Sequence, residues 1–171
     1  MKRSHLVIFS ASAGLLLAGF VMTAFLWNQI PAIIPTHFGP LGTPDAWSTK
    51  SFVMLFLVPL AQAAIFLLLT LIYKYPQYSN WPTTLILMTV EEEKREKVFE
   101  VIRSMLAWLL LIISSMFAYL QYIILATANK RANGLAPWIM FSFLGVLAVV
   151  IVYVNVRMLV TVKHIVKSAK S

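Results

Sequence analysis

His37 and Asp45 are the two residues of this sequence whose types and spacing best fit chemistry. A turn between them would bring the imidazole and the carboxylate within hydrogen-bonding distance. As a catalytic dyad the pair lacks a recognisable nucleophile, because the nearby Ser48 and Thr49 carry no signature. As a metal site it supplies two ligands, whereas catalytic zinc usually takes three from protein. The pair can also lock the turn through backbone groups, or recognise a peptide or lipid.

The segment that must position this pair is rich in proline and glycine. It reads IPAIIPTHFGPLGTPDAWSTK over residues 30–50. Pro31 and Pro35 disfavour helical geometry in the residues before them, so a short rigid arm should leave the preceding apolar run. The glycines and Pro44 then permit sharp turns. The pattern predicts a compact loop that folds back on itself, with Ile34 among the apolar side chains that dip into a membrane interface.

The composition defines the class of protein around this loop. With 60% apolar residues, 12% charged residues and a mean hydropathy of +0.83 over 171 residues, the chain carries more hydrocarbon than a soluble domain can bury. Cysteine is absent, which removes disulfides and thiolate metal sites. The net charge of +8 comes from cations beside apolar runs, so membrane lipids rather than nucleic acid are the expected partner. No cofactor is expected.

Four segments are long enough to cross a bilayer as helices, which takes about 20 apolar residues each. These spans are residues 6–30, 52–73, 105–128 and 137–162. The sequence therefore predicts an all-α membrane protein that forms one four-span domain over residues 1–171. A structured outer loop, residues 31–51, joins the first two spans, and an inner connection, residues 74–104, contains a cytoplasmic helical extension before the third.

The distribution of cations predicts the orientation of these spans. If the N-terminus is cytoplasmic, three of the 14 Lys and Arg residues face outward, namely Lys50, Lys130 and Arg131. The remaining eleven face inward: Lys2, Arg3, Lys74, Lys94, Arg95, Lys97, Arg103, Arg157, Lys163, Lys167 and Lys170. We therefore expect a multi-pass plasma-membrane protein with both termini in the cytoplasm.

The inner connection carries a second candidate surface. Its charged run consists of Glu91, Glu92, Glu93, Lys94, Arg95 and Lys97. Thr89 followed by Glu92 fits a capping box, which predicts a helix that begins near Val90 and continues into the third span. Such mixed charges form i,i+4 ion pairs on a solvated helix. The same run is also a candidate docking surface for a cytoplasmic or membrane protein.

The spans themselves argue against two classes of function. All six acidic residues lie outside them, whereas proton-coupled transporters usually place an ionisable group at membrane depth. His5, His37 and His164 lie near span ends, so no two of them could hold a haem between helices. The sequence also has no HExxH, GxSxG or Walker motif, and we therefore predict a protein without enzymatic activity.

Small and polar residues within the spans predict how the helices pack. Ser10, Gly14 and Ala18 recur every four residues, which favours close helix packing over a dedicated dimer motif. Pro59 indicates a kink in the second span. The polar residues expected to form hydrogen bonds between helices are Gln62, Ser114, Ser115, Gln121 and Asn155.

The outer loop resembles a known family pattern at nine positions of fixed spacing: Pro31, Pro35, His37, Phe38, Gly42, Pro44, Asp45, Trp47 and Lys50. In these residues the chain is similar to the membrane-domain family of unknown function that forms the N-terminal part of SdpI-like bacterial immunity proteins. The resemblance extends more loosely over all four spans. It implies protection from a secreted peptide toxin and capture of a cytoplasmic repressor, although the chain looks like the N-terminal domain alone, without the SdpI part to which immunity is usually attributed.

Two functions therefore remain open. In the first, the chain is a non-enzymatic immunity or signal-reception protein whose outer loop meets an extracellular peptide or lipid, while the inner helix reports to a protein partner. In the second, it is a small transporter or an accessory subunit of a larger membrane complex.

Overall fold

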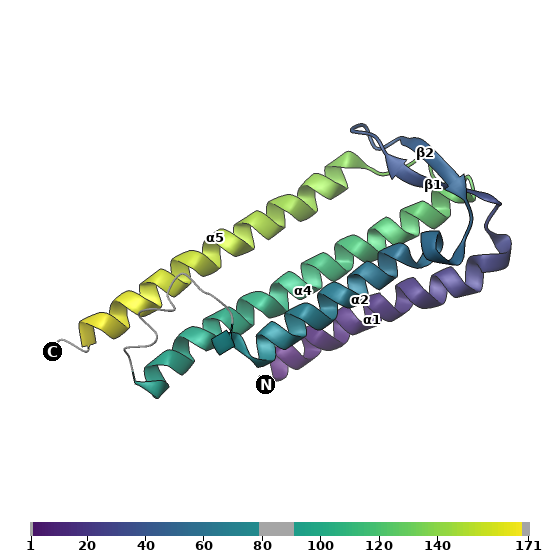
Figure 1. Ribbon diagram of the computed structural model, residues 1–171. Helices are drawn as coiled ribbons and strands as arrows, with labels where there is room; N and C mark the ends of the chain where they lie inside the picture. The colour runs from purple at the N-terminus through teal and green to yellow at the C-terminus, as the bar shows by residue number, and fades with distance from the viewer. Residues whose placement is uncertain (1, 79–90, 169–171) are drawn as a thin grey trace.

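The computed structural model describes residues 2–78 and 91–168, and Figure 1 shows their arrangement. The described chain is mostly helical. Its elements are α1 (Arg3–Leu26), a 3-10 turn η1 (Trp27–Gln29), β1 (Ile33–Phe38), β2 (Pro44–Thr49), α2 (Phe52–Lys74), η2 (Pro76–Tyr78), α4 (Glu92–Ala128) and α5 (Pro137–Ser168).

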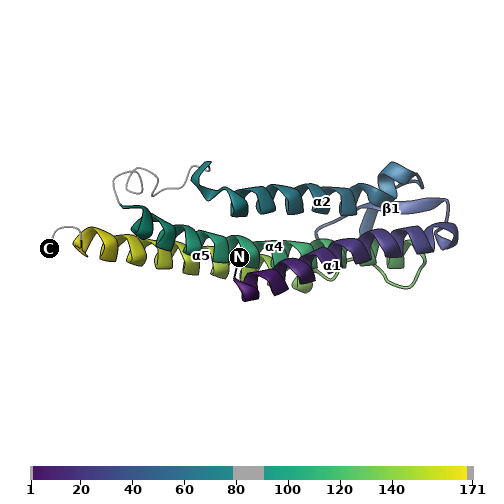
Figure 2. The same cartoon turned by 90° about the horizontal axis from the view of Figure 1, so that it is seen from below.

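The helices run up and down, and α4 is the central one. It packs against α1, α2 and α5, whereas α5 lies at the side of the bundle and packs mainly on α4 (Figures 1 and 2). The two strands lie at one end, which we call the hairpin end (Figure 1). The start of α4 and the described end of α5 lie at the opposite end, which we call the terminal end, and α1 begins on that side without reaching as far. This arrangement places the loop with His37 far from both termini.

Four helices of the described chain are long and apolar enough to cross a membrane, and together with the composition they identify a multi-pass membrane protein. The number of these helices agrees with the four predicted spans, and in the first of them α1 ends at Leu26 and a 3-10 turn continues to Gln29. The helix of the third span begins at Glu92 and has 37 residues, a length of about 55 Å. It therefore extends well beyond an apolar layer, as predicted, while Thr89 and Val90 of the expected capping box lie outside the described residues.

The segment between α1 and α2, predicted as a structured loop in an all-α protein, contains the β-strands of the described chain. Residues there form a two-stranded antiparallel hairpin, in which Ile33 pairs with Thr49, Pro35 with Trp47 and His37 with Ala46. The register shifts on both sides of His37, as in a β-bulge. Proline removes backbone donors and would break a larger sheet, but an isolated hairpin tolerates it because its outer edges carry no ladder.

Buried amides tie the helices together. Pro59 of α2 has no amide hydrogen, so the carbonyl of Leu55, four residues earlier, lacks its helical donor. Gln121 of α4 supplies one, since its Nε2 lies 3.0 Å from the Leu55 oxygen and 2.7 Å from Thr23 Oγ1. Gln62 donates to the Ser114 carbonyl at 3.4 Å. The prediction of hydrogen bonds between helices is thus confirmed for both glutamines.

Other expected packing contacts differ from the structure. Ser115 and Asn155 donate to carbonyls of their own helices, at Leu111 and Ile151, and not across an interface. Ser10, Gly14 and Ala18 face outward, and a methyl group added at Gly14 would meet nothing within 4 Å. The face of α1 that packs inside the chain is instead formed by His5, Ile8, Ser12, Gly19 and Thr23.

Candidate functional site

The base of the hairpin is inserted into the end of the helix bundle. Ile34 is buried in a cluster with Ile30, Leu55 and Leu125, and the neighbouring Pro35 is also buried. The expectation from the sequence that Ile34 inserts into a membrane interface is therefore wrong, because this side chain is buried in the core of the helix bundle. Alternation along β1 turns Ile33 outward at the same time. The hairpin therefore packs against the helix bundle through Ile34 near the start of β1.

Lys50 fastens the hairpin base to the end of α1. Its Nζ donates to the carbonyl of Ile30 at 2.8 Å and to that of Trp27 at 3.1 Å, and it lies 5.3 Å from the centre of a Trp27 ring. The backbone amide of Lys50 also donates to Ala32 at 2.7 Å. A cation at the carboxyl end of a helix is favourable because unpaired carbonyls collect there. Lys50 thus joins the base of the hairpin to the end of α1 through three hydrogen bonds.

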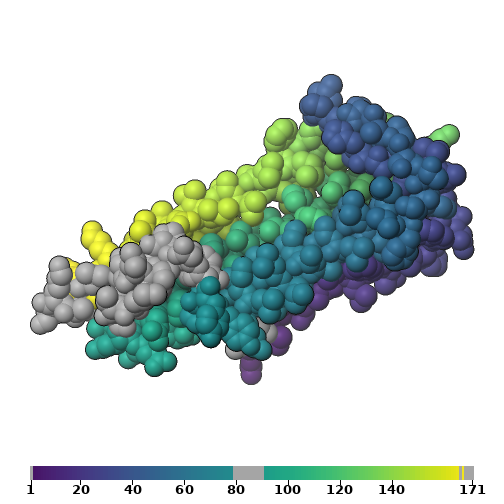
Figure 3. All heavy atoms as spheres, viewed as in Figure 1, coloured from purple at the N-terminus to yellow at the C-terminus, as the bar shows by residue number. Residues whose placement is uncertain are grey.

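The tip of the hairpin is held by the loop between α4 and α5. Leu135 donates its amide hydrogen to the Gly42 carbonyl at 2.8 Å. Gly42 has φ of +79° and Gly134 has φ of +132°, and a side chain at either position would overlap the backbone of the opposite loop. Both glycines are therefore required by conformation and by close approach. Figure 3 shows the hairpin covering this end of the molecule.

His37 and Asp45 form a pair on the exposed side of this clamped hairpin. His37 Nδ1 lies 2.5 Å from Asp45 Oδ1, which confirms that the chain folds back to join them. The two side chains are 67% and 50% exposed. The carboxylate orients the imidazole by accepting from Nδ1, and no contact to His37 Nε2 is found in the part of the chain that the structure describes. The second nitrogen is thus presented to solvent.

Two large apolar side chains of the same hairpin are also exposed. Leu41, at the turn, is 83% exposed, and Trp47, on β2, is 50% exposed. We call His37, Leu41, Asp45 and Trp47 the hairpin surface. It combines a hydrogen-bonding pair with large apolar groups, a mixture that is common where proteins bind peptides or interfaces.

A catalytic dyad or a metal site would need partners besides the His37–Asp45 pair itself. No hydroxyl of a described serine or threonine is hydrogen-bonded to His37, so a nucleophile beside the imidazole is not found there. Three or more His, Cys, Asp or Glu side chains that could hold a metal ion do not come together among the described residues. The arrangement can donate and accept hydrogen bonds, carry one negative charge and bury apolar surface.

The nine motif residues therefore differ in their contacts and exposure. Pro35, Gly42 and Lys50 hold the hairpin in place, and Pro44 lies against Gly134. Phe38 is partly buried, whereas Pro31, His37, Asp45 and Trp47 are exposed.

The charged run lies at the opposite end of the molecule, on the first turns of α4. Lys97 pairs with Glu93 at 2.9 Å and Lys94 with Glu91 at 3.4 Å. These are the ion pairs expected of a solvated helix, and exposed pairs of this kind contribute little to stability. Glu92 and Arg95 lie beside them on the same helix.

A buried histidine at the terminal end is not among the candidate site residues predicted from the sequence. His5 is 5% exposed, and its Nδ1 and Nε2 lie 2.9 Å from Tyr73 Oη and 3.2 Å from Ser104 Oγ, respectively. It therefore joins α1 to both α2 and α4. The available signal was its helical spacing from Ile8 and Ser12, which places it on the packed face of α1.

One family model and one curated relative match this chain. Residues 14–63 match a family described as "Domain of unknown function (DUF1648)", and this range contains the whole hairpin with parts of α1 and α2. The chain is also similar to a protein of Archaeoglobus fulgidus described as uncharacterized. The two are 27% identical over 144 residues, which cover 76% of this chain and 77% of the relative. No solved structure matches.

Proposed function

We propose that this membrane protein is a non-enzymatic immunity or signal-reception protein that takes a peptide or lipid ligand on the hairpin surface, at the outer face of the plasma membrane. The observation that carries this proposal is the exposed His37–Asp45 pair on a hairpin fixed at both ends. Lys50 holds its base and Gly42 its tip. A surface that is already ordered loses little conformational entropy on binding, so it favours recognition.

The chemistry of the hairpin surface favours an amphipathic peptide. Asp45 can accept hydrogen bonds from amide groups or attract a cation, and the exposed nitrogen of His37 adds a second polar contact. Leu41 and Trp47 offer exposed apolar area on the same hairpin. Buried aromatic and aliphatic anchors next to a few polar contacts are typical of binding sites with well-defined partners.

The orientation rests on the charges of the whole chain. Of the described cations, Lys50, Lys130 and Arg131 belong to the hairpin end, whereas the others belong to the terminal end. By the positive-inside rule the terminal end faces the cytoplasm. The exposed charged run from Glu91 to Lys97 would then meet a cytoplasmic or membrane protein partner and report the bound ligand. The resemblance to SdpI-like proteins supports immunity against a secreted peptide as the biological setting.

Survival assays test this proposal. Cells that express the wild-type chain, His37→Ala or Asp45→Asn are challenged with secreted peptides concentrated from the medium of the natural host. Protection by the wild-type chain and loss of protection in both variants, at equal membrane abundance, is the expected result. Both side chains are largely exposed, so their replacement should leave the fold intact.

A matched variant separates recognition from general damage. Thr36→Ala changes an exposed residue of the same strand outside the hairpin surface and should keep full protection. Equal protection by all variants would show that the pair binds nothing in this assay. Reduced abundance of both pair variants would instead assign His37 and Asp45 a structural role.

A second candidate function is that of an accessory subunit of a larger membrane complex, and one observation favours it. The helix α5 packs mainly on α4 and leaves most of its apolar side chains exposed. A partner helix could cover that surface. Transport by this chain alone has less support, since the serines at the groove between α4 and α5 bond to carbonyls of their own helices. Copurification of one defined membrane partner with the tagged chain would favour the accessory role.

A further inference from the structure

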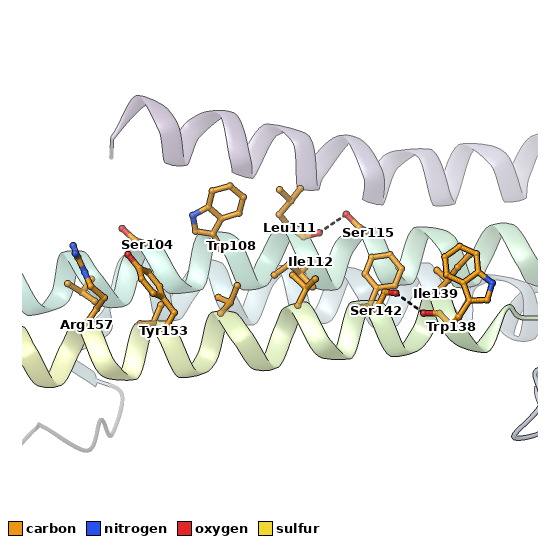
Figure 4. A pocket seen from close by; sticks show the side chains of 15 residues that line it. Ser104, Trp108, Leu111, Ile112, Ser115, Trp138, Ile139, Ser142, Tyr153 and Arg157 are labelled. Carbon is orange, nitrogen blue, oxygen red and sulfur yellow. Dashed lines mark hydrogen bonds between the residues drawn. The ribbon is translucent and has the colours of Figure 1, made fainter.

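A groove runs between α4 and α5 on the side of the bundle. Its volume is about 840 Å³, and both helices contribute side chains spaced three or four residues apart. Figure 4 shows them along the facing sides of the two helices, with Trp138 near one end and Tyr153 and Arg157 near the other. The groove opens toward the surroundings of the bundle, which for a membrane-spanning helix pair are lipid.

The lining of the groove is effectively hydrocarbon. Ser115 donates to the Leu111 carbonyl at 2.8 Å and Ser142 to the Trp138 carbonyl at 2.7 Å. Ser104 likewise donates to its own helix, at the Glu100 carbonyl. Since these hydroxyls donate to carbonyls of their own helices, a molecule bound in the groove does not need to accept hydrogen bonds from them. An acyl chain fits this lining better than a polar solute does.

The groove ends in cations at the terminal end. Arg157 lines both the groove and an adjoining pocket of about 540 Å³, whose other charged or titratable members are Lys94, Lys97 and His164. Glu91 and Glu93 pair with the two lysines. Arg157 has no carboxylate partner in the described part of the chain, and its guanidinium lies 6.0 Å from the Tyr153 ring. The end of an apolar groove thus presents an unpaired positive charge.

The distance along α5 between Trp138 and Arg157 matches the thickness of a membrane. From Trp138 to Arg157 the helix rises about 28 Å, close to the thickness of a hydrocarbon core. Trp138 is 70% exposed, as aromatic side chains at a membrane interface commonly are. Arg157 then lies near head-group depth on the opposite side, where basic pockets between membrane helices bind lipid phosphates.

We propose that this groove binds an anionic phospholipid, with one acyl chain along α4 and α5 and its phosphate at Arg157. The apolar lining, the cation at its end and the match to bilayer depth all fit one amphiphile. A chain from the leaflet at the terminal end would extend from Arg157 to about Val146, some 16 Å along α5. This site is independent of the hairpin surface, which lies at the other end of the molecule.

Native mass spectrometry of the full chain in detergent tests the head-group contact. Phosphatidylglycerol and phosphatidylcholine with identical acyl chains are offered at equal concentration. The wild-type chain should retain phosphatidylglycerol preferentially, and Arg157→Gln should reduce that retention about fivefold. Lys163→Gln, which removes an exposed cation of the same helix outside the groove and the pocket, should change it little.

A pair of tryptophan substitutions tests the acyl-chain contact. Val150→Trp fills the groove and should reduce retention of both lipids, whereas Val152→Trp adds the same side chain on an exposed face and should not. Equal retention of the two lipids by the wild-type chain would overturn the proposal, as would equal losses in Arg157→Gln and Lys163→Gln. A concentration-dependent dimer that Val150→Trp alone disrupts would also overturn it, by assigning the groove to a second copy of the chain.

Discussion

Gln121 of α4 completes the hydrogen bonding of the helix that Pro59 interrupts. Its Nε2 donates at 3.0 Å to the carbonyl of Leu55, which would otherwise accept from an amide at position 59. The same amide group donates to Thr23 of α1, so one side chain joins three helices. In lipid a carbonyl without a donor is costly, and a neighbouring helix is the usual remedy.

This relationship predicts an energetic coupling between Gln121 and Pro59. We expect Gln121→Leu to lower the free energy of unfolding by about 1 kcal/mol, because the Leu55 carbonyl loses its donor. In a Pro59→Ala background the backbone amide returns, so the same substitution should cost less. Unfolding by sodium dodecyl sulfate in mixed micelles measures the free energy of unfolding of the wild-type chain, Gln121→Leu, Pro59→Ala and the double variant. Asn155→Leu serves as a control, since Asn155 bonds only its own helix; equal costs in both backgrounds would contradict the coupling.

The glycine at the hairpin tip should be irreplaceable. Gly42→Ala places a side chain at φ +79° and against the Leu135 carbonyl, so we expect a loss of about 1 to 3 kcal/mol in the free energy of unfolding. Gly14→Ala is the matched change, because its new methyl group meets nothing within 4 Å and alanine favours a helix. Thermal unfolding in detergent compares the two. Equal melting temperatures for both variants would show that the tip contact contributes nothing.

Lys50 should control the local stability of the hairpin base. Lys50→Met keeps an apolar stem but removes the donor to Trp27 and Ile30, so amides near the end of α1 should exchange about tenfold faster. Hydrogen–deuterium exchange followed by mass spectrometry resolves this segment. Arg131→Met removes an exposed cation at the same end and should leave the exchange rates unchanged. Similar acceleration in both variants would assign the effect to net charge.

The buried histidine should stabilise the terminal end. His5→Ala removes the hydrogen bonds to Tyr73 Oη and Ser104 Oγ that join α1 to α2 and α4, and we expect a loss of about 1 to 3 kcal/mol in the free energy of unfolding. His164→Ala changes an exposed histidine near the end of α5 and should have little effect. Chemical unfolding followed by circular dichroism distinguishes them. A stable His5→Ala chain would mean that water replaces the imidazole without cost.

The proposed orientation can be tested directly because the chain contains no cysteine. A membrane-impermeant maleimide applied to intact cells should label Thr43→Cys at the hairpin tip and leave Lys97→Cys unlabelled. Both positions are exposed in the structure, so accessibility within the fold does not limit the reaction. Opening the cells should make Lys97→Cys reactive. The opposite pattern would turn the hairpin toward the cytoplasm and remove the basis for an extracellular ligand.

The sequence was sufficient to predict structure where the conformation of a segment depends on its own residues. Apolar runs of the right length predicted the four spans, since a helix satisfies its own backbone in lipid without help from distant residues. Glycine and proline around residues 39–44 predicted the turn that joins His37 to Asp45. The pair itself followed from spacing, and the structure confirms it at 2.5 Å.

Contacts between distant segments could not be predicted in the same way. The packed face of α1 contains none of Ser10, Gly14 and Ala18, because an almost uniformly apolar helix carries little information about which side meets protein and which meets lipid. The hairpin formed strands in place of an irregular loop, since pairing, burial of Ile34 and the Lys50 contact act together.

The sequence by itself determined that this chain is a membrane protein with four spans and a turn that pairs a histidine with an aspartate, because hydrophobicity and backbone restriction act locally. Only the tertiary structure decided which residues fix the hairpin to the helix bundle and which residues of the hairpin are exposed. Gly42 meets Gly134 across the fold, and Gln121 reaches the carbonyl that Pro59 leaves free. These choices depend on the close approach of segments far apart in the chain, and packing, not local preference, provides the energy for them.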